Sequence, residues 1–95
     1  MDENKKETIV NELTLLLIYL TGWEEDKRNS LGKKVFRAWK GYRFEELDKL
    51  QSQDLIQQVP GGKSLVLYEK GKEKARELMK KYIESNLRPQ KKKTK

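Results

Sequence analysis

The chain has 95 residues, of which 35% are hydrophobic and 39% charged, so it forms one domain with a small core. It contains neither cysteine nor histidine, which excludes disulfides, thiolate nucleophiles, zinc fingers and the commonest general base. We therefore expect a protein that is not an enzyme and has no metal site and no cofactor.

Most of the net charge of +7 comes from the C-terminal end. Residues 88–95 contain five lysines and arginines and no acidic residue, and removing these five from the 22 basic residues leaves 17 against 15 acidic ones. A run of like charge after Pro89 cannot bury apolar surface, so we expect a disordered basic tail at 88–95 behind a folded domain at 1–87. Such a tail attracts nucleic acid or acidic lipid without specificity, or serves solubility alone.

Targeting patterns are not visible in the sequence. The first residues are acidic, whereas a secretory signal begins with basic residues, and the apolar run 15–20 is far shorter than the roughly 20 residues that span a bilayer. The lack of cysteine suits a reducing compartment. We expect a cytoplasmic protein without a transmembrane segment.

The apolar period predicts a first helix that begins near Asn4 and ends at Gly22. One face carries five apolar residues, which are Ile9, Leu13, Leu16, Leu17 and Leu20. Other faces carry Val10, Leu15, Ile18 and Tyr19. A helix that is apolar nearly all round is buried on more than one side, either in the core of a monomer or partly against a second copy. The candidate dimer-interface residues are Leu15, Ile18, Tyr19, Met79, Tyr82 and Ile83.

The stretch 23–34 is polar, and we interpret it as a solvated loop. The next segment, 33–43, interleaves five cations with Phe36, Trp39 and Tyr42. Cations hold phosphates while aromatic rings stack on bases, which indicates a nucleic-acid surface. The alternative is that the aromatic residues anchor the core while the cations face water. We expect extended structure here, and the candidate nucleic-acid-binding residues are Lys33, Lys34, Arg37, Lys40, Arg43 and Lys63.

The remaining pattern is more regular. Phe44, Leu47 and Leu50 predict a short helix over 44–53. Two apolar runs, 55–59 and 64–68, flank a Pro-Gly-Gly-Lys turn and predict a β-hairpin. An apolar stripe through Ala75 and Leu78 predicts a last helix over about 70–86. The chain is thus of the α+β class.

The order helix, short strand or turn, helix, hairpin, helix resembles that of winged helix-turn-helix transcription regulators. The resemblance is carried by "LDKLQSQDLI", the hairpin and "LVLYEKGKEKARELMKKY", in which Leu67 and Gly71 hold the ends of the usual Leu-Thr-x-x-Gly motif. Tyr68 replaces the threonine, so the hydroxyl cap of the following helix is missing, at a cost of about 1 kcal/mol if nothing replaces it. The resemblance implies a small winged-helix-like domain with the hairpin as its wing.

A closer resemblance is to a small prokaryotic family catalogued only as a domain of unknown function. It is carried by "LLLIYLT", "RAWKGY" and "FEELDKL", and Arg37-Ala38-Trp39-Lys40-Gly41 is its most specific part. This resemblance covers most of the chain and implies a winged-helix-like fold, but no activity.

Two functions follow as hypotheses. The first is a nucleic-acid-binding regulator that uses segment 33–43 and the tail. The second is a protein-interaction or dimerisation module that does not read DNA, because the expected recognition helix carries Glu45, Glu46 and Asp48 against Lys49 alone. Expected partners are therefore nucleic acid, a second copy or another protein, and no small-molecule substrate is evident.

Overall fold

The computed structural model describes residues 2–28, 32 and 34–84. Its elements are α1 (Glu3–Thr21), β1 (Trp23–Arg28), β2 (Lys34–Trp39), α2 (Phe44–Ser52), β3 (Ile56–Gln58), β4 (Ser64–Leu67), α3 (Glu69–Met79) and a π-helical turn, η1 (Lys80–Glu84). The predicted α+β class is confirmed. Lys33 and the tail 88–95 lie outside the described residues.

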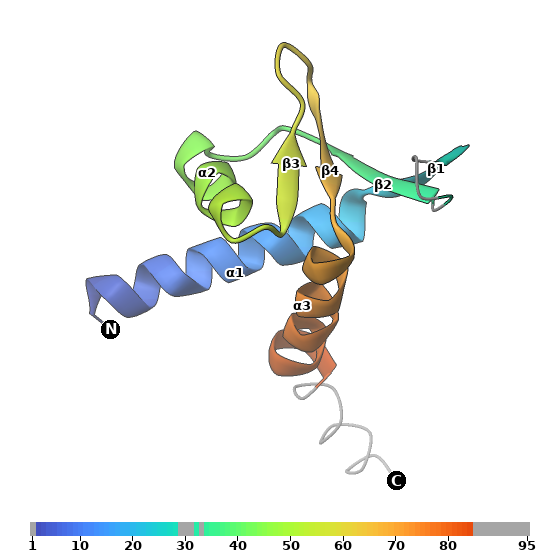
Figure 1. Cartoon of the computed structure of the whole chain (residues 1–95). Coiled ribbons are helices and arrows are strands. Elements are labelled where there is room, and N and C mark those ends of the chain that lie inside the picture. Colours follow the sequence, from blue (N-terminus) through green and yellow to red (C-terminus); the bar gives the residue numbers. More distant parts are fainter. Residues whose placement is uncertain (1, 29–31, 33, 85–95) are drawn as a thin grey trace, which may run out of the picture.

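The strands form one antiparallel sheet with the order β1-β2-β4-β3, and α1 runs beneath it in Figure 1. One face of this sheet is buried, because Ala38, Ile56, Leu65 and Leu67 all lie in the core. The strand register pairs Ala38 with Leu65 and Ile56 with Leu67, so these side chains point to the same side. The other face lacks such a layer of buried side chains, as the alternating burial of β4 indicates.

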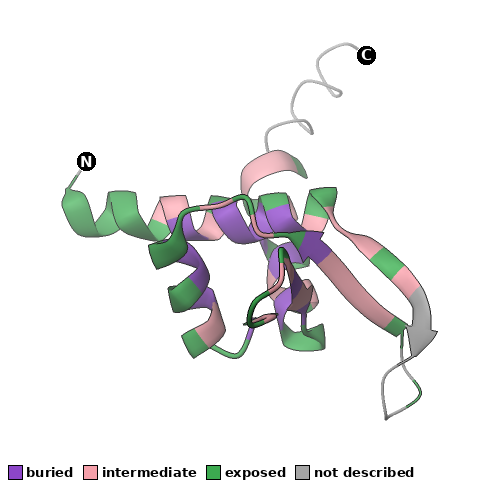
Figure 2. Cartoon of the chain, turned by 90° about the horizontal axis from the view of Figure 1, so that it is seen from above, coloured by how far each residue is buried: buried purple, intermediate pink, exposed green. Residues whose placement is uncertain are grey.

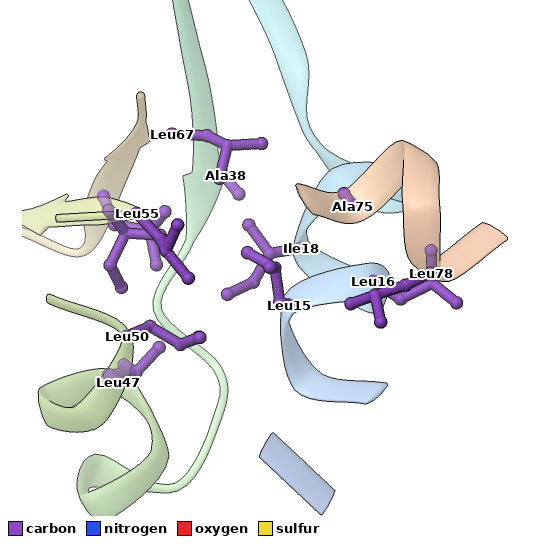
Figure 3. Packing of buried hydrophobic residues seen from close by; sticks show 12 residues of the cluster. Leu15, Leu16, Ile18, Ala38, Leu47, Leu50, Leu55, Leu67, Ala75 and Leu78 are labelled. Carbon is purple, nitrogen blue, oxygen red and sulfur yellow. The ribbon is translucent and has the colours of Figure 1, made fainter. Parts of the chain in front are cut away.

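Helix α1 is the centre of the core. Figure 2 shows buried positions along its middle and its first turns exposed all round. In Figure 3, Leu15 and Ile18 point toward the sheet and α2, and Leu16 lies beside Leu78 of α3. Leu15 and Ile18 are therefore inside the chain and inaccessible to a partner, so their prediction as dimer-interface residues is wrong.

Burial within the single chain does not extend to all the apolar residues of α1. Leu13, Leu17 and Leu20 are exposed, whereas polar Asn11 and Thr14 are buried. The reason is that Asn11 donates hydrogen bonds to Glu46 of α2, and this places the Asn11 side of the helix inward. The helix also begins earlier than predicted, because Asp2, rather than Asn4, accepts a capping hydrogen bond from the backbone N–H of Lys5.

The predicted loop over 23–34 is wrong for its first half, since Trp23–Arg28 forms β1. Pairing with β2 satisfies the backbone of this polar segment, a gain that its composition does not reveal. Extended structure is confirmed for Lys34–Trp39, and helix 44–53 and the hairpin are confirmed to within a few residues.

The described chain between β2 and β3 contains one helix, α2, where a helix-turn-helix unit needs two. The strands β2, β4 and β3 are neighbours in that order, and β1 adds a further strand at the edge beside β2. The last helix is α-helical only to Met79 and then π-helical to Glu84. Tyr68 precedes it and makes no side-chain cap, as predicted.

Candidate nucleic-acid interface

The alternation of β2 divides segment 33–43 between the two faces of the sheet. Ala38 is buried, and Phe36 on the same side packs against the core. Tyr42, beyond the strand, also packs against the core. Arg37 and Trp39 point the other way, and Trp39 is 63% exposed. The alternative in which the aromatic residues anchor the core therefore holds for Phe36 and Tyr42, whereas Trp39 is at the surface.

The strand register gathers side chains from all four strands around Arg37. Trp23 of β1 and Val66 of β4 lie directly opposite Arg37, and Gln57 of β3 lies opposite Val66. The rings of Trp23 and Trp39 are in contact, with centroids 5.1 Å apart and planes tilted by 50°. We call this surface the open face of the sheet and define it by Trp23, Arg37, Trp39, Gln57 and Val66.

The guanidinium of Arg37 is held on the open face by partners on both neighbouring strands. Its Nε lies 3.0 Å from Oε1 of Glu25 on β1, and its Nη1 donates to Oγ of Ser64 on β4 at 3.3 Å. Both members of the ion pair are partly buried, so salt screens it less than an exposed pair. The pair fixes the guanidinium beside Trp39 and compensates much of its charge.

Lys40 and Lys63 meet at the end of the open face. The backbone N–H of Lys40 donates to the carbonyl oxygen of Lys63 at 2.8 Å, which joins the end of β2 to the turn between β3 and β4. The ammonium of Lys40 contacts the carbonyl oxygen of Val59 at 3.3 Å, and Lys63 is exposed. The backbones of these two residues are therefore adjacent to those of Trp39 and its strand partner Ser64.

The other predicted cations are not gathered at this end. Lys34 is exposed at the far end of β2, about 17 Å from Trp39 for five steps of an extended strand. Arg43 is exposed and precedes α2. Of the predicted set, the structure brings together Arg37, Lys40 and Lys63.

The expected recognition helix, α2, does not present a basic surface. Glu45 and Asp48 are exposed, and Lys49 lies 3.8 Å from Glu7 of α1. Glu46, however, is buried and accepts a hydrogen bond from Asn11, so it adds no charge to the surface. Of the three acidic residues of this helix, only Glu45 and Asp48 therefore lie at the surface.

The four remaining dimer-interface candidates are half-buried and pack against the core. They are Tyr19, Met79, Tyr82 and Ile83. The Tyr82 hydroxyl donates to Oε1 of Glu12 at 2.6 Å, and Lys81 approaches the same oxygen at 3.0 Å. Burial pushes the pKa of Glu12 upward, but the hydrogen bonds from Tyr82 and Lys81 outweigh it, so the pKa lies below the usual 4.5. This cluster ties η1 to α1.

A groove of about 410 Å³ lies between α1, α2 and α3. Its apolar lining consists of four leucines, which are Leu15, Leu50, Leu55 and Leu78. Charges of both signs share it, including Glu7, Glu12, Lys49 and Lys74. None of the predicted nucleic-acid-binding residues lines it.

Among the residues that the structure describes, no group of three acidic side chains is arranged to hold a metal ion.

Sequence reasoning missed Trp23 and Glu25. Both lie in the segment interpreted as a loop, and both reach the open face because β1 pairs with β2. The available signal is weak, since "WEEDKR" has no β-branched residue and only one apolar one. Trp23 and Glu25 are two positions apart, which is the spacing of one strand face, but that spacing alone does not indicate a strand.

Comparison of the chain with curated proteins and with solved structures finds no match. No described helix combines the length and apolar composition needed to cross a membrane. A match to one protein family extends over residues 6–85, which includes every strand, α2, α3, η1 and most of α1. The chain therefore belongs to the family described as "Domain of unknown function (DUF6429)", which confirms the predicted membership in a family of unknown function.

Proposed function

We propose that the protein binds single-stranded nucleic acid on the open face of its sheet, in a regulatory rather than an enzymatic role. The observation that carries this proposal is the 63% exposure of Trp39 beside Trp23, with Arg37, Lys40 and Lys63 around it. Large aromatic residues usually lie in the core of a small domain, so an indole this exposed suggests a surface that a ligand covers.

Stacking supplies the first part of the binding energy. A base that stacks on an aromatic side chain contributes about 1–3 kcal/mol, whatever its identity. Trp23 packs against one part of the Trp39 indole at a tilt of 50° and supports it. The rest of that indole is free to receive a base, and the half-buried Val66 extends the apolar surface toward β4.

Charge supplies the second part. Lys40 and Lys63 sit at the end of the open face, within reach of the phosphates that flank a stacked base. Arg37 is already paired with Glu25, so its contribution is to hold the floor of the site rather than to neutralise a phosphate. The basic tail, 88–95, would add affinity that does not depend on the open face.

The charge of α2 argues against a protein that reads duplex DNA with this helix. The exposed carboxylates of α2, Glu45 and Asp48, would meet phosphates at short range in a groove. In this proposal only the β3–β4 hairpin acts as it would in a winged-helix protein, because its turn presents the exposed Lys63 to the sugar-phosphate backbone of the nucleic acid. We therefore expect preference for single strands and little dependence on base sequence.

The chain's own fluorescence provides a direct test. Both of its two tryptophans lie on the open face, so a bound base should quench them. We expect quenching of the full chain by an oligothymidylate at low salt, with affinity that falls as salt rises.

The matched variants are Trp39→Ala and Phe44→Ala, because Phe44 is an exposed aromatic residue on α2, 69% accessible and outside the open face. Affinity, measured by anisotropy of a labelled oligonucleotide, should fall at least fivefold for Trp39→Ala and stay unchanged for Phe44→Ala. Equal affinities for the wild type and both variants would assign all binding to the tail and contradict the proposal.

A further inference from the structure

We propose that the protein forms a homodimer in which the exposed faces of two α1 helices pack antiparallel. The proposal rests on an apolar stripe that consists of Val10, Leu13, Leu17 and Leu20. It is independent of the nucleic-acid proposal, because the apolar stripe and the open face of the sheet lie on different elements.

The apolar stripe is exposed in the single chain. Leu13 is 39% accessible, Leu17 48% and Leu20 50%, and Val10 is half-buried. A helix that faces solvent normally carries charged residues on its outer side. Here the sequence has no charged residue from Leu13 to Gly22, although 39% of the chain is charged. The outer side of α1 is thus composed like an interface rather than a solvated surface.

Rotation of α1 cannot bring the apolar stripe into the monomer. At 100° per residue, Leu13, Leu17 and Leu20 lie about half a turn away from Asn11, Leu15 and Ile18. The latter set is buried, and Asn11 is bonded to Glu46. Turning the stripe inward would break that pair and expose Leu15 and Ile18. Any cover for the apolar stripe must therefore come from outside the described chain.

The spacing of the apolar stripe identifies a second copy as the occupant. Its steps of three, four and three residues alternate as the apolar positions of a two-stranded coiled coil do, where the repeat is 3.5 residues. Side chains with this repeat interdigitate with another seam of the same repeat. A second α1 offers that seam, and a two-fold axis brings the two together without any further requirement.

Charge selects the antiparallel orientation. Continued toward the N-terminus, the same repeat reaches Lys6 and then Glu3, both exposed. A parallel pair would set each of these residues against its own copy, and like charges in a seam repel. An antiparallel pair instead sets Val10 against the partner's Leu20 and Leu13 against the partner's Leu17. All four apolar positions are then used, and no like charges face one another.

The contact between the two stripes is small. The apolar stripe is about 15 Å long for ten helical steps, so the buried area falls below the roughly 800 Å² per partner of a standard complex. We therefore expect a dimer with a dissociation constant in the micromolar range, which exchanges with monomer, rather than an obligate dimer.

Sedimentation velocity of the full chain, from micromolar to near-millimolar concentration, tests the interface. The variant Leu17→Glu places a charge in the middle of the apolar stripe, and Phe44→Glu is its matched control on an exposed apolar residue of α2. We expect a dimer for the wild type and for Phe44→Glu, and a dissociation constant at least tenfold higher for Leu17→Glu. Both positions are exposed, so far-UV circular dichroism should show all three proteins folded.

A wild-type chain that stays monomeric at near-millimolar concentration would overturn the proposal, as would equal weakening by Leu17→Glu and Phe44→Glu. So would a monomer whose apolar stripe instead binds vesicles of acidic phospholipid in a way that Leu17→Glu abolishes.

Cysteine cross-linking tests the orientation, because the natural chain has no cysteine. Chains with Leu13→Cys are mixed with chains with Leu17→Cys and oxidised. The antiparallel arrangement predicts that the mixed pair cross-links faster than either variant with itself. Faster cross-linking of Leu13→Cys chains to one another would show a parallel pair and overturn the stated arrangement.

Discussion

The side-chain amide of Asn11 donates to a carboxylate oxygen of Glu46 at 2.8 Å and to the backbone oxygen of Glu46 at 3.2 Å. Both residues are buried, one in α1 and the other in α2. This contact orients α1 about its own axis. Because Asn11 faces α2, Leu15 and Ile18 face the core one and two turns later, and Leu13, Leu17 and Leu20 face outward.

Replacing Asn11 with leucine should destabilise the fold strongly. The variant leaves a carboxylate buried without its amide partner, which lowers the free energy of unfolding by about 3 kcal/mol. Urea unfolding followed by circular dichroism measures this loss. The control Asn4→Leu makes the same change at an exposed position of α1 and should be nearly neutral. Adding Glu46→Leu to Asn11→Leu should recover much of the loss, and failure to do so would show that the pair is not coupled.

Gly71 is required at the start of α3. A Cβ there would collide with the backbone oxygen of Leu55 and would lie 2.7 Å from Cδ1 of Leu67. Both obstacles are in the core, so Gly71→Ala should lower the free energy of unfolding by about 2–3 kcal/mol. Gly41→Ala is the control, since a Cβ at Gly41 meets nothing within 4 Å. Comparable melting temperatures for the two variants would contradict this packing account.

The cluster of Glu12, Tyr82 and Lys81 predicts a pH dependence of stability. The pKa of Glu12 in the folded chain is below its usual 4.5, so its ionised form stabilises the fold. This contribution is fully present above pH 4.5 and is lost as the pH falls through the folded pKa. Wild type should therefore exceed Glu12→Gln in unfolding free energy at pH 7, and the difference should shrink below pH 4.5. A difference that grows on acidification would have the wrong sign.

Within the nucleic-acid proposal, Lys63 should contact a phosphate and Lys49 should not. The dependence of log affinity on log salt should become shallower by about 0.7 for Lys63→Ala, which is the change expected for one contact to a single strand. Lys49→Ala, on α2 and near Glu7, should leave the slope unchanged. Fluorescence titrations at several salt concentrations measure both slopes. Equal slopes for the two variants would place Lys63 outside the binding surface.

The sequence by itself determined the elements whose signals are local. The first helix, the helix near Phe44 and the last helix follow from apolar periods, and the β3–β4 hairpin follows from its Pro-Gly-Gly turn. Membership in a family of unknown function was also predictable, and the match over residues 6–85 confirms it. Each of the helices and the hairpin is encoded within a short segment of the chain, so no distant contact is needed to recognise it.

The candidate site was only partly predictable for the opposite reason. Lys40 and Lys63 could be named as cations, but their proximity depends on a backbone hydrogen bond between β2 and a distant turn. Trp23 joins Trp39 because a polar segment becomes a strand when β2 is available to pair with it. The sequence likewise did not decide that Phe36 is buried and Trp39 exposed, since either face of an isolated strand can meet a core.

The tertiary structure alone decided which side of α1 is buried. Apolar residues lie on more than one side of α1, so composition alone does not tell which side is buried. The hydrogen bond from Asn11 to Glu46 allows the Asn11 side into the core, because two polar groups that satisfy each other can enter a core while either one alone cannot. Such a pair is invisible in either segment by itself, and it is what leaves Leu13, Leu17 and Leu20 on the surface.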